Sequence, residues 1–348
     1  MQRNFITHLN FAKGFRGGER QTLLLIEELS KRGYRQKIFT RVNSTLAKRL
    51  INIENLEIIK IKKPYIFNIS LFKNSNILHA HETKAAQVAY LVNLFYKIPY
   101  IITRRVDNSI KNNFFNKQIY ENSSYTIVLS RAIKNKLDKI SKNINIQIIP
   151  SAYSKLTIDQ KESINLKKRF KDKFIIGNIG ELDNTHKGQY YLIEAMKKLQ
   201  INYPNIHLIL LGKGKDELRY KEQSNQLSNI TFEGFVDNVK DYIQIFDIFV
   251  FPSLNEGLGS ILFDIMQAKV PIIASNVGGI PDIIQSNKNG ILVESKDSDA
   301  IYYAIENLYL DQNLRLKISQ EAYKDIENFS YIKMCDRYEN IYNKITVQ

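Results

Sequence analysis

One stretch of the sequence combines a glycine turn with two acids. It reads Pro252-Ser253-Leu254-Asn255-Glu256-Gly257-Leu258-Gly259-Ser260 and leads into an apolar helical pattern that carries Asp264. The turn follows an apolar strand pattern, so free amides and the positive end of a helix could face an anion. Carboxylates at Glu256 and Asp264 are suited to accepting hydrogen bonds from sugar hydroxyls. A tight strand-to-helix connection alone would explain the glycines but not the paired acids. The stretch therefore predicts a ligand site.

Three cations stand at the ends of other predicted elements. Lys187 precedes a helix opened by Gly188, where its ammonium group could neutralise a diphosphate. Arg104 and Arg105 end a predicted strand, and their paired N–H donors could grip a phosphate. Each of the three could equally be a solvated surface side chain. Each of these residues indicates an anion site, but none of them alone determines where the site lies.

Two glycines and a histidine near the start of the chain are further candidates. Gly17 and Gly18 precede the first predicted helix, so backbone amides there could approach a phosphate or sugar closely; a plain tight turn is the alternative. His81 follows a strand at its carboxyl end, the edge where open α/β sheets bind ligands. The sequence has no Asp-x-Asp, no Cys/His cluster with ligand spacing and no Walker loop, so no metal site is predicted.

Apolar periodicity predicts strands that alternate with helices along most of the chain. Strands are expected over 5–11, 34–40, 76–79, 99–103, 125–129, 144–149, 174–179, 206–211, 230–232, 247–251 and 270–274. Helices are expected over 19–32, 82–97, 131–140, 188–202, 238–246, 259–268, 297–309 and about 330–345. This alternation is typical of parallel sheets with crossover connections, so we expect the α/β class.

The rhythm breaks once, at a polar and lysine-rich stretch over residues 154–172 that we interpret as a linker. We therefore expect an N-terminal Rossmann-like domain over 1–165 and a second one over 166–330, facing each other across a cleft. The last helix, within 331–348, has one apolar stripe and is expected to dock back on the first domain.

Several motifs resemble the donor-binding core of glycosyltransferase family 4, retaining enzymes with the GT-B fold. The matching text is Gly234-Phe235-Val236, Phe251-Pro252-Ser253, Glu256-Gly257-Leu258-Gly259, Gly278-Gly279-Ile280-Pro281-Asp282 and Asn289-Gly290. Upstream matches are Lys187-Gly188-Gln189, Leu211-Gly212-Lys213-Gly214, Gly17-Gly18-Glu19-Arg20 and His79-Ala80-His81. The resemblance covers nearly the whole chain and is specific for the family rather than for a substrate.

The resemblance implies a role for each candidate. Glu256 would approach the donor sugar, Asp264 the ribose, Lys187 the diphosphate, Phe235 the base, and His81 the sugar near the reacting carbon. The donor-binding set that it implies is completed by Gly17, Gly18, Gly212, Gly257, Leu258, Gly259 and Ser260. Two positions depart from the family pattern: Asp264 replaces a glutamate, and Glu181 stands near the place of a usual arginine.

Composition narrows the class of protein. The 348 residues are 44% hydrophobic, which excludes intrinsic disorder, and Cys335 is the single cysteine, which excludes a disulfide scaffold and suits a reducing cytosol. No apolar run reaches the length of a membrane span, and the first ten residues lack a signal-peptide pattern. We therefore expect a cytoplasmic protein.

The net charge of +15 is unevenly distributed. Residues 1–170 hold 31 Lys and Arg against 11 Asp and Glu, whereas residues 171–348 hold 19 against 24. A basic half favours an anionic partner, which we take to be a membrane surface and a phosphorylated lipid-linked or lipopolysaccharide-core acceptor. Nucleic acid is not expected, because no aromatic-basic module accompanies the charge. The protein is thus expected at the inner face of the cytoplasmic membrane.

Together these features predict a retaining, metal-independent hexosyltransferase that uses a nucleotide sugar, a UDP-sugar above all, as substrate and needs no cofactor. A nucleotide-sugar epimerase of the same fold is the first alternative. A catalytically degenerate binding or scaffold subunit is the second, because of the departures at Glu181 and Asp264.

Overall fold

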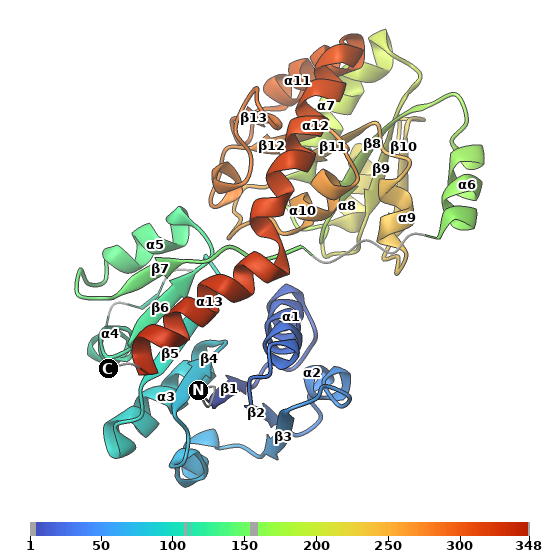
Figure 1. The fold of residues 1–348 in the computed structure, drawn as a ribbon. Coiled ribbons are helices and arrows are strands. Elements are labelled where there is room, and N and C mark those ends of the chain that lie inside the picture. Colours follow the sequence, from blue (N-terminus) through green and yellow to red (C-terminus); the bar gives the residue numbers. More distant parts are fainter. Residues whose placement is uncertain (1–4, 108–109, 112, 154–158, 347–348) are drawn as a thin grey trace. The chain divides into compact units, whose positions relative to one another are not determined.

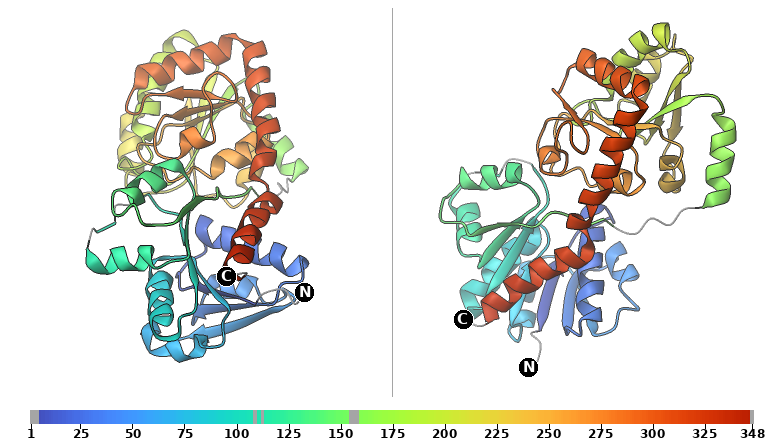
Figure 2. Two further views of the ribbon diagram at one scale, coloured as in Figure 1. Left: turned by 60° about the vertical axis from the view of Figure 1, so that its left-hand side comes forward. Right: turned by 45° about the horizontal axis from the view of Figure 1, so that its top comes forward.

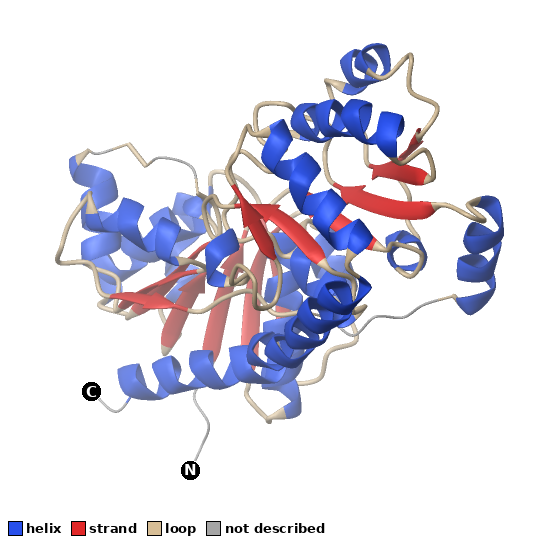
Figure 3. Cartoon of the chain, turned by 90° about the horizontal axis from the view of Figure 1, so that it is seen from above, coloured by secondary structure: helices blue, strands red, loops and turns tan. Residues whose placement is uncertain are grey.

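A computed structural model describes residues 5–107, 110–111, 113–153 and 159–346. The chain forms two compact units (Figure 1). Unit 1 comprises residues 1–152 and 329–348, and unit 2 comprises residues 153–328. In each unit the strands lie between helices (Figure 3). None of the helices in the described ranges combines the length and the apolar character of a membrane span.

Unit 1 is built on a parallel seven-stranded sheet with the order β3-β2-β1-β4-β5-β6-β7. Its strands are β1 (Ile6–Asn10), β2 (Gln36–Arg41), β3 (Leu56–Ile61), β4 (Ile77–Ala80), β5 (Tyr100–Arg104), β6 (Tyr125–Val128) and β7 (Ile146–Ile148). Its helices are α1 (Gly17–Lys31), α2 (Thr45–Arg49), the 3-10 helix η1 (Tyr65–Phe72), α3 (Thr83–Tyr96), α4 (Phe114–Glu121), α5 (Arg131–Asp138) and α13 (Tyr331–Thr346).

Unit 2 repeats the plan with a parallel six-stranded sheet of order β10-β9-β8-β11-β12-β13. Its strands are β8 (Phe174–Ile179), β9 (Ile206–Leu211), β10 (Ile230–Gly234), β11 (Ile248–Phe251), β12 (Ile272–Ser275) and β13 (Ile291–Val293). Its helices are α6 (Gln160–Arg169), α7 (Gln189–Asn202), α8 (Glu217–Gln223), α9 (Val239–Ile243), α10 (Ile261–Gln267), η2 (Ile280–Asp282), α11 (Ser298–Leu310) and α12 (Gln312–Asp325), and η3 (Ile326–Phe329) leads back to unit 1.

The linker expected over residues 154–172 differs from the structure. Residues 154–158 lie outside the described part of the chain, and residues 160–169 form α6, which packs against α9 in unit 2. The Asp159 carboxylate caps this helix by accepting hydrogen bonds from the amides of Lys161 and Glu162. Leu166 is the only buried apolar residue of this lysine-rich helix, so its sequence shows no apolar periodicity. The observed division therefore falls at residue 152, ahead of the expected one at residue 165.

Helix α13 returns the chain to unit 1 and packs beside α1 (Figures 1 and 2). Its apolar stripe, which includes Met334, Tyr338 and Ile341, joins one buried cluster with residues of α1, β1, β4, β5 and β6. Burial of these side chains supplies most of the docking free energy, since transfer of apolar area from water is the dominant favourable contribution.

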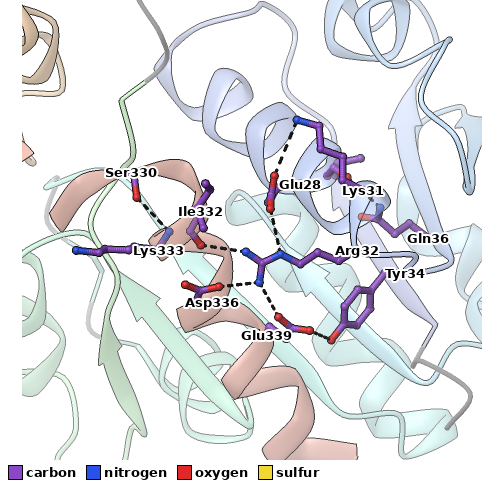
Figure 4. Close-up of polar contacts among 11 residues, drawn as sticks. Glu28, Lys31, Arg32, Tyr34, Gln36, Ser330, Ile332, Lys333, Asp336 and Glu339 are labelled. Carbon is purple, nitrogen blue, oxygen red and sulfur yellow. Dashed lines mark hydrogen bonds and ion pairs between the residues drawn. The ribbon is translucent and has the colours of Figure 1, made fainter. Parts of the chain in front are cut away.

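Arg32, at the end of α1, ties α13 to unit 1 through several acceptors (Figure 4). Its guanidinium lies 2.7 Å from an Asp336 oxygen, 2.6 Å from Glu339 and 3.1 Å from Glu28. Tyr34 donates its hydroxyl hydrogen to Glu339 over 2.7 Å. The Arg32 side chain is 18% exposed, so these ion pairs are partly shielded from water.

A second polar network crosses the centre of unit 1. His79 on β4 contacts the Tyr342 hydroxyl of α13 and the Thr103 hydroxyl of β5, both at 2.7 Å. His8 on β1 stands opposite His79 in the sheet register and contacts His81 and Gln36, both at 3.0 Å. Burial lowers the pKa of His8 to about 4 and the pKa of His79 well below its ordinary value. These rings are therefore neutral at physiological pH.

Replacing Arg32 by Met should destabilise unit 1. The substitution leaves Asp336, Glu339 and Glu28 without their shared cation, at a cost of about 1–3 kcal/mol for partly buried pairs. Urea unfolding followed by circular dichroism measures the change. Lys198→Met is the matched control, because it removes an ion pair with Asp299 that is exposed to solvent, and its midpoint should stay at the parental value. Equal midpoints for the two variants would contradict this account.

The protein should lose stability on mild acidification. Between pH 6.5 and about 4 the unfolded chain protonates His8 whereas the native state does not. Stability therefore falls as pH falls through this window, by about 3 kcal/mol for His8 alone. Unfolding midpoints measured across the window test this. A His8→Gln variant, which keeps an amide donor and acceptor, should show a shallower pH dependence, and an unchanged slope would rule out His8 as the source.

Candidate functional site

The strand order of each sheet reverses at one point, and loops diverge there. In unit 2 the reversal lies between β8 and β11, and in unit 1 it lies between β1 and β4. Ligands of open α/β sheets bind in the crevice outside the carboxyl ends of the strands at such points. The loops concerned are 180–188 and 252–260 in unit 2, and 11–16 and 81–82 in unit 1. They hold most of the residues that the sequence singled out.

Lys187 and Glu256 meet at the switch point of unit 2. The Lys187 ammonium nitrogen lies 2.6 Å from a Glu256 carboxylate oxygen, although the residues come from different loops. Their side chains are 25% and 18% exposed, and the ammonium also lies 5.3 Å from the centre of the Phe251 ring. An ammonium group carries three N–H donors, so it can hold Glu256 and still reach an anion. The pair places one positive and one negative group at the same point of the loop cluster.

Two glycines let neighbouring loops pack against the segment that carries Glu256. Gly188 has φ of +64°, and a Cβ there would lie 2.1 Å from the Pro252 carbonyl oxygen. Gly278 has φ of +56°, and a Cβ there would lie 1.8 Å from the Glu256 carbonyl oxygen, which accepts a hydrogen bond from Gly279 at 3.0 Å. Larger residues would push both loops away. Backbone contact from two sides therefore fixes this segment.

Of the other residues expected around the donor, those of unit 2 lie at the same edge of its sheet, with different exposure, whereas Gly17, Gly18 and His81 belong to unit 1. Phe235 follows β10 and is 70% exposed, whereas Leu258 is 3% exposed and offers only its backbone to a ligand. Asp264 is 8% exposed and lies in the first turn of α10. The remaining members of the expected set are Gly212 after β9, and Gly257, Gly259 and Ser260, which precede α10.

Glu181, the second departure from the family pattern, is exposed. Its backbone oxygen accepts a hydrogen bond from the Gln189 side chain at 3.0 Å. Water screens an exposed carboxylate, so the negative charge weakens anion binding nearby less than a buried one would.

Unit 1 contains a pocket of about 330 Å³ at its own switch point. It is lined by Gly18 at the start of α1, by His81 after β4, and by Arg104 and Arg105 at the end of β5. Gly17 is the first residue of α1 beside it. Two acids of the lining, Glu19 and Glu82, already accept backbone hydrogen bonds, from Arg16 at 2.9 Å and from Lys84 and Ala85 at 2.7 and 2.8 Å.

Arg105 carries buried donors for which the described residues supply no acceptor. Its Nε and Nη1 atoms are shielded from water and have no hydrogen-bond partner in the part of the chain that the structure describes. Burial lowers the pKa of Arg105, yet the group stays charged at any physiological pH. Arg104 differs, because its guanidinium contacts the Tyr120 hydroxyl at 3.4 Å. Buried, unpaired donors are costly, so they indicate a ligand acceptor at this point of the pocket.

A chain of hydrogen bonds fixes the proton on His81. Gln36 donates its amide to the Ile26 carbonyl at 3.0 Å, so its oxygen faces His8 and accepts from His8 Nε2. His8 Nδ1 must then accept from His81 Nε2, which leaves a lone pair on His81 Nδ1. That nitrogen is buried without a partner. Burial, with His79 and Arg105 nearby, lowers the pKa of His81 well below its ordinary value. His81 therefore offers a hydrogen-bond acceptor beside the Arg105 donors.

No role is expected for His79 from the sequence, and His8 is not singled out there, yet the structure groups both with His81. Ligand nitrogens of the three rings lie within 4.8 Å of one another. Both ring nitrogens of His8 and of His79 already make hydrogen bonds, and a cation there would lie near Arg105. The group therefore acts as a hydrogen-bond network. The sequence contains a signal for this group, because His81 directly follows the strand of His79 and the two residues are two positions apart, which places them on the same side of the extended chain.

Comparison with known proteins agrees with this architecture. Residues 159–325 match the family model "Glycosyl transferases group 1". The capsular polysaccharide biosynthesis glycosyltransferase CapM of Staphylococcus aureus is 27% identical over 62% of this chain, and the match spans only 60% of CapM. The lipopolysaccharide core biosynthesis glycosyltransferase LpsE of Rhizobium meliloti is 22% identical over 96% of this chain and 97% of LpsE.

Among solved structures, the Anabaena protein HepE in complex with UDP superposes with a TM-score of 0.86. The match covers 97% of this chain and 99% of HepE at 16% identity, which is a likeness of fold. Residues 159–325 of unit 2 are thus similar to the glycosyl transferases group 1 family, and the two parallel-sheet units of the chain have the GT-B fold.

Proposed function

We propose that this protein is a retaining, metal-independent hexosyltransferase that moves a sugar from a UDP-sugar to a phosphate-bearing cell-envelope glycolipid, such as a lipid-linked or lipopolysaccharide-core acceptor. The observation that carries the proposal is the contact between Lys187 and Glu256 at the switch point of unit 2. A cation and a carboxylate 2.6 Å apart suit a ligand in which a diphosphate adjoins a sugar.

The donor takes its place on unit 2 in the order of its chemical groups. Phe235, 70% exposed at the strand edge, stacks on the base, and Asp264 accepts from the ribose hydroxyls. Lys187 turns its free donors to the diphosphate, and Glu256 accepts hydrogen bonds from the hexose. Because Glu256 also holds Lys187, the two groups keep the diphosphate and the sugar in register.

Transfer breaks the bond between the anomeric carbon and the diphosphate oxygen and forms a bond from an acceptor hydroxyl to the same carbon. The hydroxyl proton passes to the leaving phosphate, on the same face of the sugar, so the configuration is retained. Lys187 stabilises the negative charge that develops on the diphosphate, a task for which a fixed cation suffices without a metal.

The pocket of unit 1 supports an anionic acceptor. Arg105 supplies N–H donors that have no partner among the described residues, and His81 supplies a nitrogen that can accept a hydrogen bond. A ligand with a phosphate beside a free hydroxyl satisfies both. Unit 1 as a whole is basic, with 29 Lys and Arg against 11 Asp and Glu, whereas unit 2 has 21 against 24. This asymmetry draws anionic ligands to unit 1.

The setting in the cell envelope rests on the relatives. CapM is named for capsular polysaccharide biosynthesis and LpsE for lipopolysaccharide core biosynthesis, and HepE was crystallised with UDP. Acceptors of such pathways sit at membranes, so we place this protein at the inner face of the cytoplasmic membrane.

Glu256→Gln should lower kcat by at least about a hundredfold and leave the fold intact, because a neutral amide neither holds Lys187 nor accepts as strongly from the sugar. Transfer from UDP-glucose to envelope extract is measured with EDTA present. Glu321→Gln is the matched control, since Glu321 forms a 2.6 Å ion pair with Lys324 on α12. Transfer by the Glu256 variant at the parental rate would refute the role. An isomerised nucleotide sugar formed without acceptor would indicate an epimerase instead.

Arg105→Met should raise KM for a phosphorylated acceptor by at least about tenfold and change KM for its dephosphorylated form little, because only the phosphate uses the guanidinium donors. Affinity for UDP, measured by thermal shift, should stay the same. Arg219→Met, at an exposed arginine of unit 2, should change none of these values. An equal rise in KM for the phosphorylated and the dephosphorylated acceptor would show that the pocket does not bind the phosphate.

A further inference from the structure

Six large apolar side chains of unit 1 are exposed on neighbouring elements. They lie on η1 and on the last turn of α3, two elements that pack against each other. We call them the η1–α3 surface: Ile66 (45% exposed), Phe67 (78%), Leu71 (53%), Leu94 (50%), Phe95 (64%) and Tyr96 (40%). Isolated exposed apolar residues are ordinary, but six on two elements that pack against each other, three of them aromatic, indicate a surface that meets an apolar partner.

The apolar character continues along α3 toward α4. Tyr90, one turn before Leu94, contacts the Phe115 ring edge-on with 5.8 Å between centroids. Phe114, the first residue of α4, is 79% exposed. α3 packs against α4 as well as η1, and Figure 1 shows α3 and α4 on one side of unit 1. The apolar band thus extends along α3 to the start of α4, close in sequence to Arg104 and Arg105.

Lysines flank the η1–α3 surface, and acids are scarce in the segments that form it. Lys62, Lys63, Lys73 and Lys97 are all exposed. Between residues 58 and 106 the sequence contains one acid, Glu82, which caps the opposite end of α3. A partner that covers these apolar groups must therefore also accept several positive charges.

We propose that the η1–α3 surface docks unit 1 on an anionic lipid bilayer. Aromatic side chains favour the boundary between headgroups and acyl chains, and nearby lysines reach the anionic headgroups. The inference rests on the proposed function only in that a glycolipid acceptor gives the protein a reason to be at a membrane. A second copy of the chain is a poorer occupant, because two such faces would bring their lysines against each other.

The chain contains no tryptophan, so one introduced indole reports on its surroundings without background. Phe67→Trp and Phe95→Trp keep an aromatic ring at exposed positions of the η1–α3 surface. Their emission should shift to the blue when phosphatidylcholine vesicles containing phosphatidylglycerol are added, and the shift should vanish with phosphatidylcholine alone. Ile201→Trp, at a residue 81% exposed on unit 2, is the matched control and should not shift. Equal shifts for all three variants, or none for any, would overturn the proposal.

The double variant Phe67→Ser with Phe95→Ser should lower the parental affinity for the same anionic vesicles by at least about tenfold, because two aromatic rings leave the bilayer. UDP affinity, measured by thermal shift without vesicles, should remain parental. Parental vesicle binding by the double variant would overturn the docking surface. If the parental protein does not bind UDP, that result contradicts the proposed function and not the docking surface. The two failures are therefore distinguishable.

Discussion

The reversal of strand order in each parallel sheet is the constraint on which the rest of this structure depends. Parallel strands carry all their carboxyl ends to one edge, and the reversal separates two of the loops that leave that edge. In unit 2 the gap lies between β8 and β11, and Lys187 and Glu256 come from those two loops. In unit 1 it lies between β1 and β4, where Gly18 and His81 line the pocket. One topological rule thus gives both units a binding edge.

The two units stabilise these edges by different means. Unit 2 relies on close backbone contact, since Gly188 and Gly278 bring neighbouring loops onto the segment of Glu256. Unit 1 relies on buried side chains, since Gln36 and His8 set the proton on His81. The second device is more sensitive to acid, because a neutral buried histidine resists protonation that the unfolded chain accepts.

Much of the fold could be predicted from the sequence. β8 and β9 begin and end where the apolar pattern does, and α5 begins at residue 131 as expected. β3 was not predicted because it is an edge strand with mixed burial. α12 was not predicted because only Ile318, Ser319 and Ala322 are buried along its length. α6 was hidden by lysines. Short or weakly buried elements carry little periodic signal, so tertiary packing decides them.

The candidate site divides in the same way. Lys187 and Glu256 could be singled out because they sit in motifs of distinctive residue types, although their direct contact required the loops to be placed. The partnership of His8 with His81 could not be found from spacing within one segment, because it depends on β1 pairing with β4 across 73 positions of sequence. Donors without partners, such as those of Arg105, are a property of packing alone.

The position of α13 also orders the events of biosynthesis. Unit 1 is assembled from both ends of the chain, and residues 331–346 leave the ribosome only after the whole of unit 2. Until then the residues of α1 and of the sheet that pack against Met334 and Tyr338 lack this apolar cover. Unit 2 is continuous in sequence and can complete its core first. The nascent protein therefore exposes apolar surface on unit 1 until α13 packs against it.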